Sequence, residues 1–130
     1  MQDRPTAFEL LEAVRGFLER DVVPALEGPR RFHALVAANV LAIVRRELDG
    51  EEDRLLGEWR RIAPLLDEGG PTPSGLAALR TAVREVTTRL AERIQRGEAD
   101  TDPLRAAVRG AVRETVVEKL RVANPRFLGT

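Results

Sequence analysis

A chain of 130 residues is long enough to bury one hydrophobic core, and we expect a single domain over residues 1–130. Its 21 basic and 21 acidic residues balance to no net charge and Tyr is absent, which argues against nucleic-acid binding, since that needs a basic surface and aromatic stacking. With no Cys and one His, disulfides, zinc–thiolate sites and multi-histidine metal sites within one chain are excluded, and we expect no cofactor.

The first predicted helix begins after Pro5. Thr6 and Glu9 stand three residues apart, the spacing of a capping box, in which each side chain accepts a hydrogen bond from the other residue's backbone N–H. Pro24 disfavours helical geometry at Val23, so this helix is expected to kink or end there. No basic-then-apolar leader precedes it, which favours a cytoplasmic protein.

A second helix is predicted over about residues 29–48. The run from Phe32 to Val44 contains only two polar residues, His33 and Asn39, so this helix is apolar on nearly every side. Such a helix needs protein around most of its surface, and we expect it to be central and buried. It is too short for a membrane span, which takes about 20 apolar residues, and no membrane association is expected.

His33 and Asn39 are the candidate buried polar or interface residues. As a general base, His33 would need a carboxylate or nucleophile within hydrogen-bond reach, and the sequence specifies none. A partly buried, hydrogen-bonded His near the helix start is favoured instead. A buried amide without a partner costs about 1–3 kcal/mol, so Asn39 is expected to bond to a backbone group or to a partner protein.

Three more helices complete the prediction. A shorter one starts in the acidic cluster 51–53, and Pro64 makes its last turn irregular. A flexible Pro/Gly loop over 67–75 precedes a long helix from about Ser74 to Gln95. The last helix starts at Asp102-Pro103 and leaves a tail over 125–130. Because no run alternates with period two, the fold class is all-α: a bundle of four long helices plus one shorter helix.

Arginines recur every four residues along the last helix, at Arg105, Arg109 and Arg113. Like charges at this spacing mildly destabilise a helix, so an acidic group is expected nearby. Glutamates close in the sequence can supply it internally, which gives an ordinary solvated surface; they are Glu92, Glu114 and Glu118. The alternative is an interaction face for an acidic surface or a phosphate.

Phe127 and Leu128 lie beyond the last helix. These apolar residues either fold back over the bundle or insert into a groove of another chain. No Walker-type phosphate-binding loop is present, because Gly69-Gly70 is not followed by Lys and Ser or Thr. The residues therefore indicate no catalytic or cofactor-binding site, and whether the chain is an enzyme stays open.

Two segments resemble a known family. The opening DRPTAFELLEAVRGFLERDVVPALEG, continuing into RFHALVAANVLAIVRREL, and the closing KLRVANPRFL are similar to the bacterial family called domain of unknown function 6285. The resemblance covers roughly residues 3–49 and 104–128, and it carries no catalytic motif and no site residues. Members of this family tend to be encoded beside a kinase that looks like the aminoglycoside phosphotransferases and beside an acyl-CoA dehydrogenase.

The resemblance implies a function. The family includes the small subunit of a kinase in levulinate breakdown, where 4-hydroxyacyl-CoA is phosphorylated before dehydration. This chain is accordingly expected to be a non-catalytic accessory subunit of a hydroxyacyl-CoA kinase, with that kinase as its partner. The alternative is a homo-oligomeric, self-associating helical bundle with a structural or scaffolding role, and a third hypothesis, an enzyme, rests on His33 and nearby carboxylates.

Overall fold

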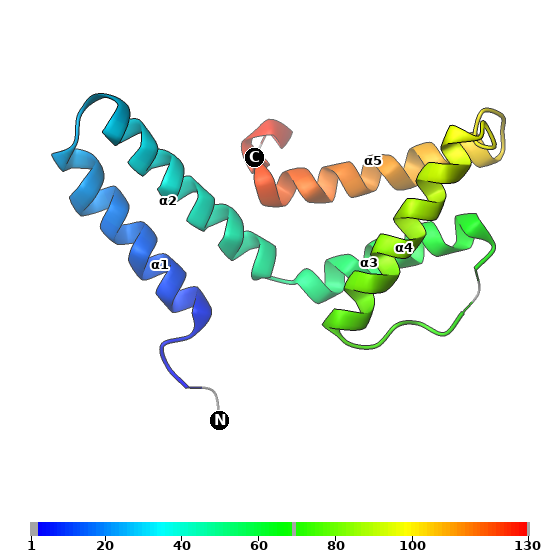
Figure 1. The fold of residues 1–130 in the computed structure, drawn as a ribbon, viewed down its shortest axis with the longest axis horizontal. Coiled ribbons are helices and arrows are strands. Elements are labelled where there is room, and N and C mark those ends of the chain that lie inside the picture. Colours follow the sequence, from blue (N-terminus) through cyan, green and yellow to red (C-terminus); the bar gives the residue numbers. More distant parts are fainter. Residues whose placement is uncertain (1–2, 69, 130) are drawn as a thin grey trace. The chain divides into compact units, whose positions relative to one another are not determined.

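The computed structural model describes residues 3–68 and 70–129 (Figure 1). These residues form five α-helices joined by short 3-10 and π segments, without a strand, so the predicted all-α class is confirmed. The contacts gather in two compact units. The first unit contains the described residues up to Asp49 together with Val122–Asn124, and the second contains Gly50–Arg121 and the described residues from Pro125 on. The single domain stays a prediction.

The first unit is built on an antiparallel helix pair (Figure 1). α1 (Ala7–Phe17) starts with the predicted capping box: Thr6 Oγ1 accepts from the Glu9 N–H at 3.2 Å, and Glu9 Oε2 accepts from the Thr6 N–H at 2.7 Å. A π-helical turn over Leu18–Val22 and a 3-10 turn over Val23–Ala25 follow. The predicted break at Pro24 is therefore confirmed.

α2 (Gly28–Leu48) has the predicted bounds but not the predicted burial. Its buried residues are three alanines spaced four apart, Ala34, Ala38 and Ala42. Small side chains at this spacing form one ridge and let α1 approach closely. The large apolar residues Phe32, Val36, Val40 and Val44 stay exposed. Within the first unit, the expectation of a helix buried on nearly every side is wrong, because α1 and the turns that follow it cover only one side of α2.

The second unit contains α3 (Glu51–Ile62), a 3-10 turn over Ala63–Leu66, α4 (Leu76–Gln95) and α5 (Leu104–Ala123) as far as Arg121. Its core joins residues from α3, the 3-10 turn after it, α4 and α5: Ile62, Ala63, Val86, Leu90 and Val108. Trp59 and Leu104 pack against this core while staying partly exposed. The irregular end predicted at Pro64 is confirmed.

The loop and the tail complete the second unit. The described residues of segment 67–75 form no helix; Gly69 lies outside the described residues, and the flexibility expected of this loop stays a prediction. The tail is not extended, because Pro125–Leu128 forms a 3-10 turn. None of the helices among residues 3–68 and 70–129 combines the length and the hydropathy that crossing a bilayer requires.

Candidate functional site

The two polar residues of α2 lie on its uncovered surface. His33 and Asn39 are both exposed, so their prediction as buried residues is wrong. The reason is that α1 covers the alanine ridge, and neither residue lies on that ridge. The ring centroid of Phe32 is 6.0 Å from that of His33, and neither polar side chain hydrogen-bonds to another described residue. Their alternative role at an interface stays a prediction.

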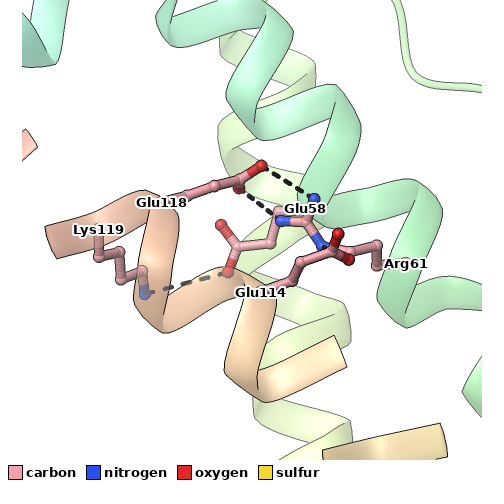
Figure 2. A network of polar contacts seen from close by, with 5 residues as sticks. All are labelled: Glu58, Arg61, Glu114, Glu118 and Lys119. Atoms are coloured by element: carbon pink, nitrogen blue, oxygen red, sulfur yellow. Dashed lines mark hydrogen bonds and ion pairs between the residues drawn. The ribbon is translucent and has the colours of Figure 1, made fainter. Parts of the chain in front are cut away.

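Arg61 on α3 lies at the centre of a network of polar contacts in the second unit (Figure 2). Its guanidinium donates to both carboxylate oxygens of Glu118 on α5, at 3.0 and 2.5 Å. Its Nε lies 3.8 Å from Oε2 of Glu114. The hydrogen bond to Glu118 raises the pKa of Arg61, and nearby Glu114 and Glu58 act in the same direction. Two planar groups joined by paired hydrogen bonds fix the register between α3 and α5.

Glu58 adds a buried carboxylate to this network. The residue is only 9% exposed and one of its oxygens lies 3.9 Å from the Nζ of Lys119 on α5. Figure 2 shows Glu58 and Arg61 on one helix opposite Glu114, Glu118 and Lys119 on another. The network holds α5 against α3.

This arrangement changes the electrostatics of α5. Glu114 and Glu118 were expected to compensate the arginines of their own helix, but both contact Arg61 instead. Arg105 pairs with Asp102 at 3.0 Å. Arg109 and Arg113 are exposed and form no ion pair or hydrogen bond with a described residue. The internal compensation expected from the sequence is therefore wrong for these two arginines.

Two exposed valines lie on the same side of α5 as the arginines. Val112 and Val116 are 43% and 48% exposed. Each of them lies three residues from one arginine and seven residues from another, and this spacing puts the five residues on one helical face. We call this surface the α5 face; it consists of Arg105, Arg109, Val112, Arg113 and Val116. It combines positive charge with exposed apolar side chains, which is the chemistry of a protein-binding surface.

A depression of about 380 Å³ borders the α5 face. Its lining is Ile94, Ala99, Asp100, Arg105, Val108 and Arg109. The lining thus combines apolar side chains with two arginines and one carboxylate. The sequence pattern identified the arginines, but the depression also needs residues from the end of α4 and from the connection that follows it.

The two apolar residues of the tail differ in exposure. Phe127 is 74% exposed, so folding back over the bundle is wrong for this side chain. Leu128 is partly buried within the turn over Pro125–Leu128. Insertion of Phe127 into another chain stays a prediction. No group of three or more His, Asp or Glu side chains in the described part of the chain is arranged to hold a metal ion.

Sequence reasoning missed the Arg61 network. Arg61 and Glu118 are 57 residues apart, and no local spacing rule joins them. One local signal was present: Glu58 lies three residues after Leu55 and four before Ile62, at a position that belongs to the apolar stripe of α3. A carboxylate in such a stripe requires a basic partner from the same or a facing helix.

Comparison with known families gives one match. The sequence model of the family described as Domain of unknown function (DUF6285) matches residues 24–127, which is most of the chain. No curated protein matches the chain, and no solved structure matches it either.

Proposed function

From the premise that the chain belongs to the DUF6285 family, we propose that it is a non-catalytic accessory subunit of a kinase that looks like the aminoglycoside phosphotransferases. The proposed reaction of the complex is phosphorylation of a hydroxyacyl-CoA in acid catabolism. The kinase chain supplies the catalytic groups, and this chain binds it through the α5 face. The resemblance of the sequence to this family suggests the kinase as the partner, and the α5 face is the surface through which the chain would bind it.

The uncompensated charge of Arg109 and Arg113 is the observation that carries the proposal. Two exposed guanidinium groups one helical turn apart repel each other, and the carboxylates closest in sequence are held by Arg61. An acidic surface that approaches these arginines removes this repulsion and forms charge-assisted hydrogen bonds. The α5 face therefore favours an acidic partner.

The valines of the α5 face favour a protein over a phosphate group. Val112 and Val116 expose apolar surface directly beside the arginines, and an isolated phosphate gains nothing from it. A helix or loop that carries carboxylates around an apolar residue would cover both. Aromatic residues and Arg are enriched at the centre of protein interfaces, where desolvation strengthens their contacts.

The proposal is tested by recovering the partner and then measuring its affinity. The tagged full chain is used as bait in an extract of its native host, and a phosphotransferase-like kinase is expected among the retained proteins. Binding of the purified kinase is then measured by isothermal titration calorimetry. Arg109→Glu combined with Arg113→Glu is expected to weaken the affinity by at least about tenfold, since reversed charges face the same acidic surface.

The matched control reverses two other arginines of the second unit. Arg60 and Arg84 are exposed and have no ion-pair partner among the described residues, so Arg60→Glu combined with Arg84→Glu makes the same change in net charge. This control is expected to bind the kinase as the wild-type chain does. If both double variants weakened kinase binding equally, the loss of affinity would come from the change in net charge, and a role of the α5 face would be contradicted.

A further inference from the structure

The depression beside the α5 face lies where the end of α4 and the connection after it meet the start of α5 (Figure 1). Its apolar residues differ in exposure: Val108 is 6% exposed and Ala99 packs against the core, whereas Ile94 is 42% exposed. The volume of about 380 Å³ lies at the lower end of the roughly 300–1,000 Å³ of small-molecule sites. The depression therefore has room for one side chain and offers it the apolar surface of Ile94.

Two opposite charges of this lining have no partner in the described part of the chain. Arg105 is already paired, because its guanidinium donates to Asp102 at 3.0 Å. Arg109 on α5 and Asp100 on the connection form no ion pair and no side-chain hydrogen bond with a described residue, and they do not pair with each other. An occupant of the depression thus meets one guanidinium donor and one carboxylate acceptor.

The charged residues at the end of α4 do not supply these partners. Arg93 and Arg96 both contact the carboxylate of Glu98, at 2.6 and 2.7 Å, and their hydrogen bonds lower the pKa of Glu98. Arg93 also donates to the backbone carbonyl of Leu65 at 2.8 Å. Glu98 is therefore held by α4, and Arg93 is held away from Asp100.

The two unpaired charges determine which occupant fits. A free phosphate or a small carboxylate would be attracted by Arg109 but repelled by Asp100, and a simple cation would be repelled by Arg109. A peptide segment satisfies both charges, because a backbone N–H can donate to Asp100 while an acidic side chain accepts from Arg109. An apolar side chain of the same segment covers Ile94 and removes its surface from water.

We infer that the depression receives one apolar side chain of a partner protein, from a segment in which an acidic residue stands beside that side chain. The identification of this partner as the kinase rests on the proposed function. Most of the affinity of a protein interface comes from a few residues seated in pockets, and the contacts around them mainly exclude water. The depression is therefore expected to contribute more to affinity than the exposed valines Val112 and Val116.

Nuclear magnetic resonance titrations of the isotope-labelled full chain test the inference with defined probes. The capped dipeptide acetyl-leucyl-glutamyl-amide is expected to bind with a Kd on the order of 1 mM and to shift the signals of Ala99, Val108 and Arg109. The glutaminyl analogue lacks the carboxylate and is expected to bind at least about threefold more weakly. Inorganic phosphate is expected to shift these signals far less. Absence of shifts with the acidic dipeptide, or equal shifts with phosphate, would overturn the inference.

A matched pair of variants tests the apolar contact. Ile94→Ala is expected to weaken binding of the acidic dipeptide at least about fivefold, because the exposed apolar surface of the depression is lost. The control is Leu48→Ala on α2, since Leu48 is also 42% exposed and loses the same number of carbon atoms. This control is expected to bind the dipeptide as the wild-type chain does. Unchanged binding by Ile94→Ala, or equal weakening by the two variants, would contradict the assigned contact.

Binding kinetics with the purified kinase separate this inference from the proposed function. Ile94→Ala is expected to speed dissociation at least about tenfold and to change the association rate little, because the apolar contact forms after the encounter. Arg109→Glu combined with Arg113→Glu is expected mainly to slow association. A kinase that binds but leaves Ile94→Ala as slowly as the wild type contradicts the inference alone. A chain that binds the dipeptide but no kinase contradicts the proposed function alone.

Discussion

Arg61 shows how much one side chain organises in this protein. It joins α3 to α5 by paired hydrogen bonds to Glu118, and only 19% of its side chain is exposed. Breaking such a contact leaves a partly buried carboxylate without its counter-charge, which costs more than the pair itself contributes. Because Arg61 contacts Glu114 and Glu118, these carboxylates do not form ion pairs with Arg109 and Arg113.

Replacing Arg61 by Met is therefore expected to lower the free energy of unfolding by about 2–4 kcal/mol, because the partly buried carboxylate of Glu118 loses its partner. The matched control is Arg60→Met, which removes a neighbouring exposed guanidinium and should change the free energy by no more than about 0.5 kcal/mol. Urea unfolding, monitored by circular dichroism, measures the free energy of unfolding of both variants. Similar losses for the two variants would contradict a special role of Arg61.

A pH-dependent contribution is expected from Glu51 at the start of α3. Its carboxylate accepts two hydrogen bonds from Arg80, at 2.7 and 2.8 Å, and the hydrogen bond to Arg80 is the main cause that lowers its pKa below 4.5. A lowered pKa means that the folded state binds the proton less readily than the unfolded state. The stabilisation is therefore present above the ordinary pKa of Glu and is lost as the pH falls through the folded-state value.

Glu51→Gln is expected to cost about 0.5–1 kcal/mol at neutral pH, a modest value because Arg80 is half exposed and water screens the pair. The difference from the wild type should shrink as the pH is lowered below 4.5. Unfolding titrations at several pH values measure it. Glu52→Gln, in the same first turn, is the control, and an equal loss there would assign the effect to the helix dipole.

The helices differ in how far their surroundings were predictable. The bounds of α2 follow from Pro29 and Gly50, and the break after α1 follows from Pro24, since these residues act through local backbone geometry. The sequence did not predict which side of α2 is covered. A helix that is apolar on nearly every side could pack through any of several faces. Its sequence alone did not indicate that α1 packs against the face that carries the alanines.

The close contact at the alanine ridge leads to a prediction about α1 and α2 as elements. Ala38 is 3% exposed, so Ala38→Leu forces the two helices apart and is expected to cost about 1–3 kcal/mol. Ala37→Leu, at the exposed neighbouring position, is the control and should be close to neutral. Thermal unfolding of both variants measures the difference. If Ala38→Leu were as stable as the wild type, close packing at this ridge would be refuted.

At the scale of the whole molecule, the α5 face is basic with exposed apolar residues among the charges. The sequence identified Arg105, Arg109 and Arg113 through their spacing. It did not show that they remain uncompensated, because the contacts of Glu114 and Glu118 with Arg61 depend on how α3 and α5 pack.

The proposed role as an accessory subunit rests on the α5 face, and activity tests it most directly. The initial rate of ATP-dependent phosphorylation of a 4-hydroxyacyl-CoA is measured with the kinase alone, with the wild-type chain added, and with the variant that carries Arg109→Glu and Arg113→Glu. The rate is expected to rise on addition of the wild-type chain and to stay low with the variant. Full activity of the kinase alone would contradict the proposed function.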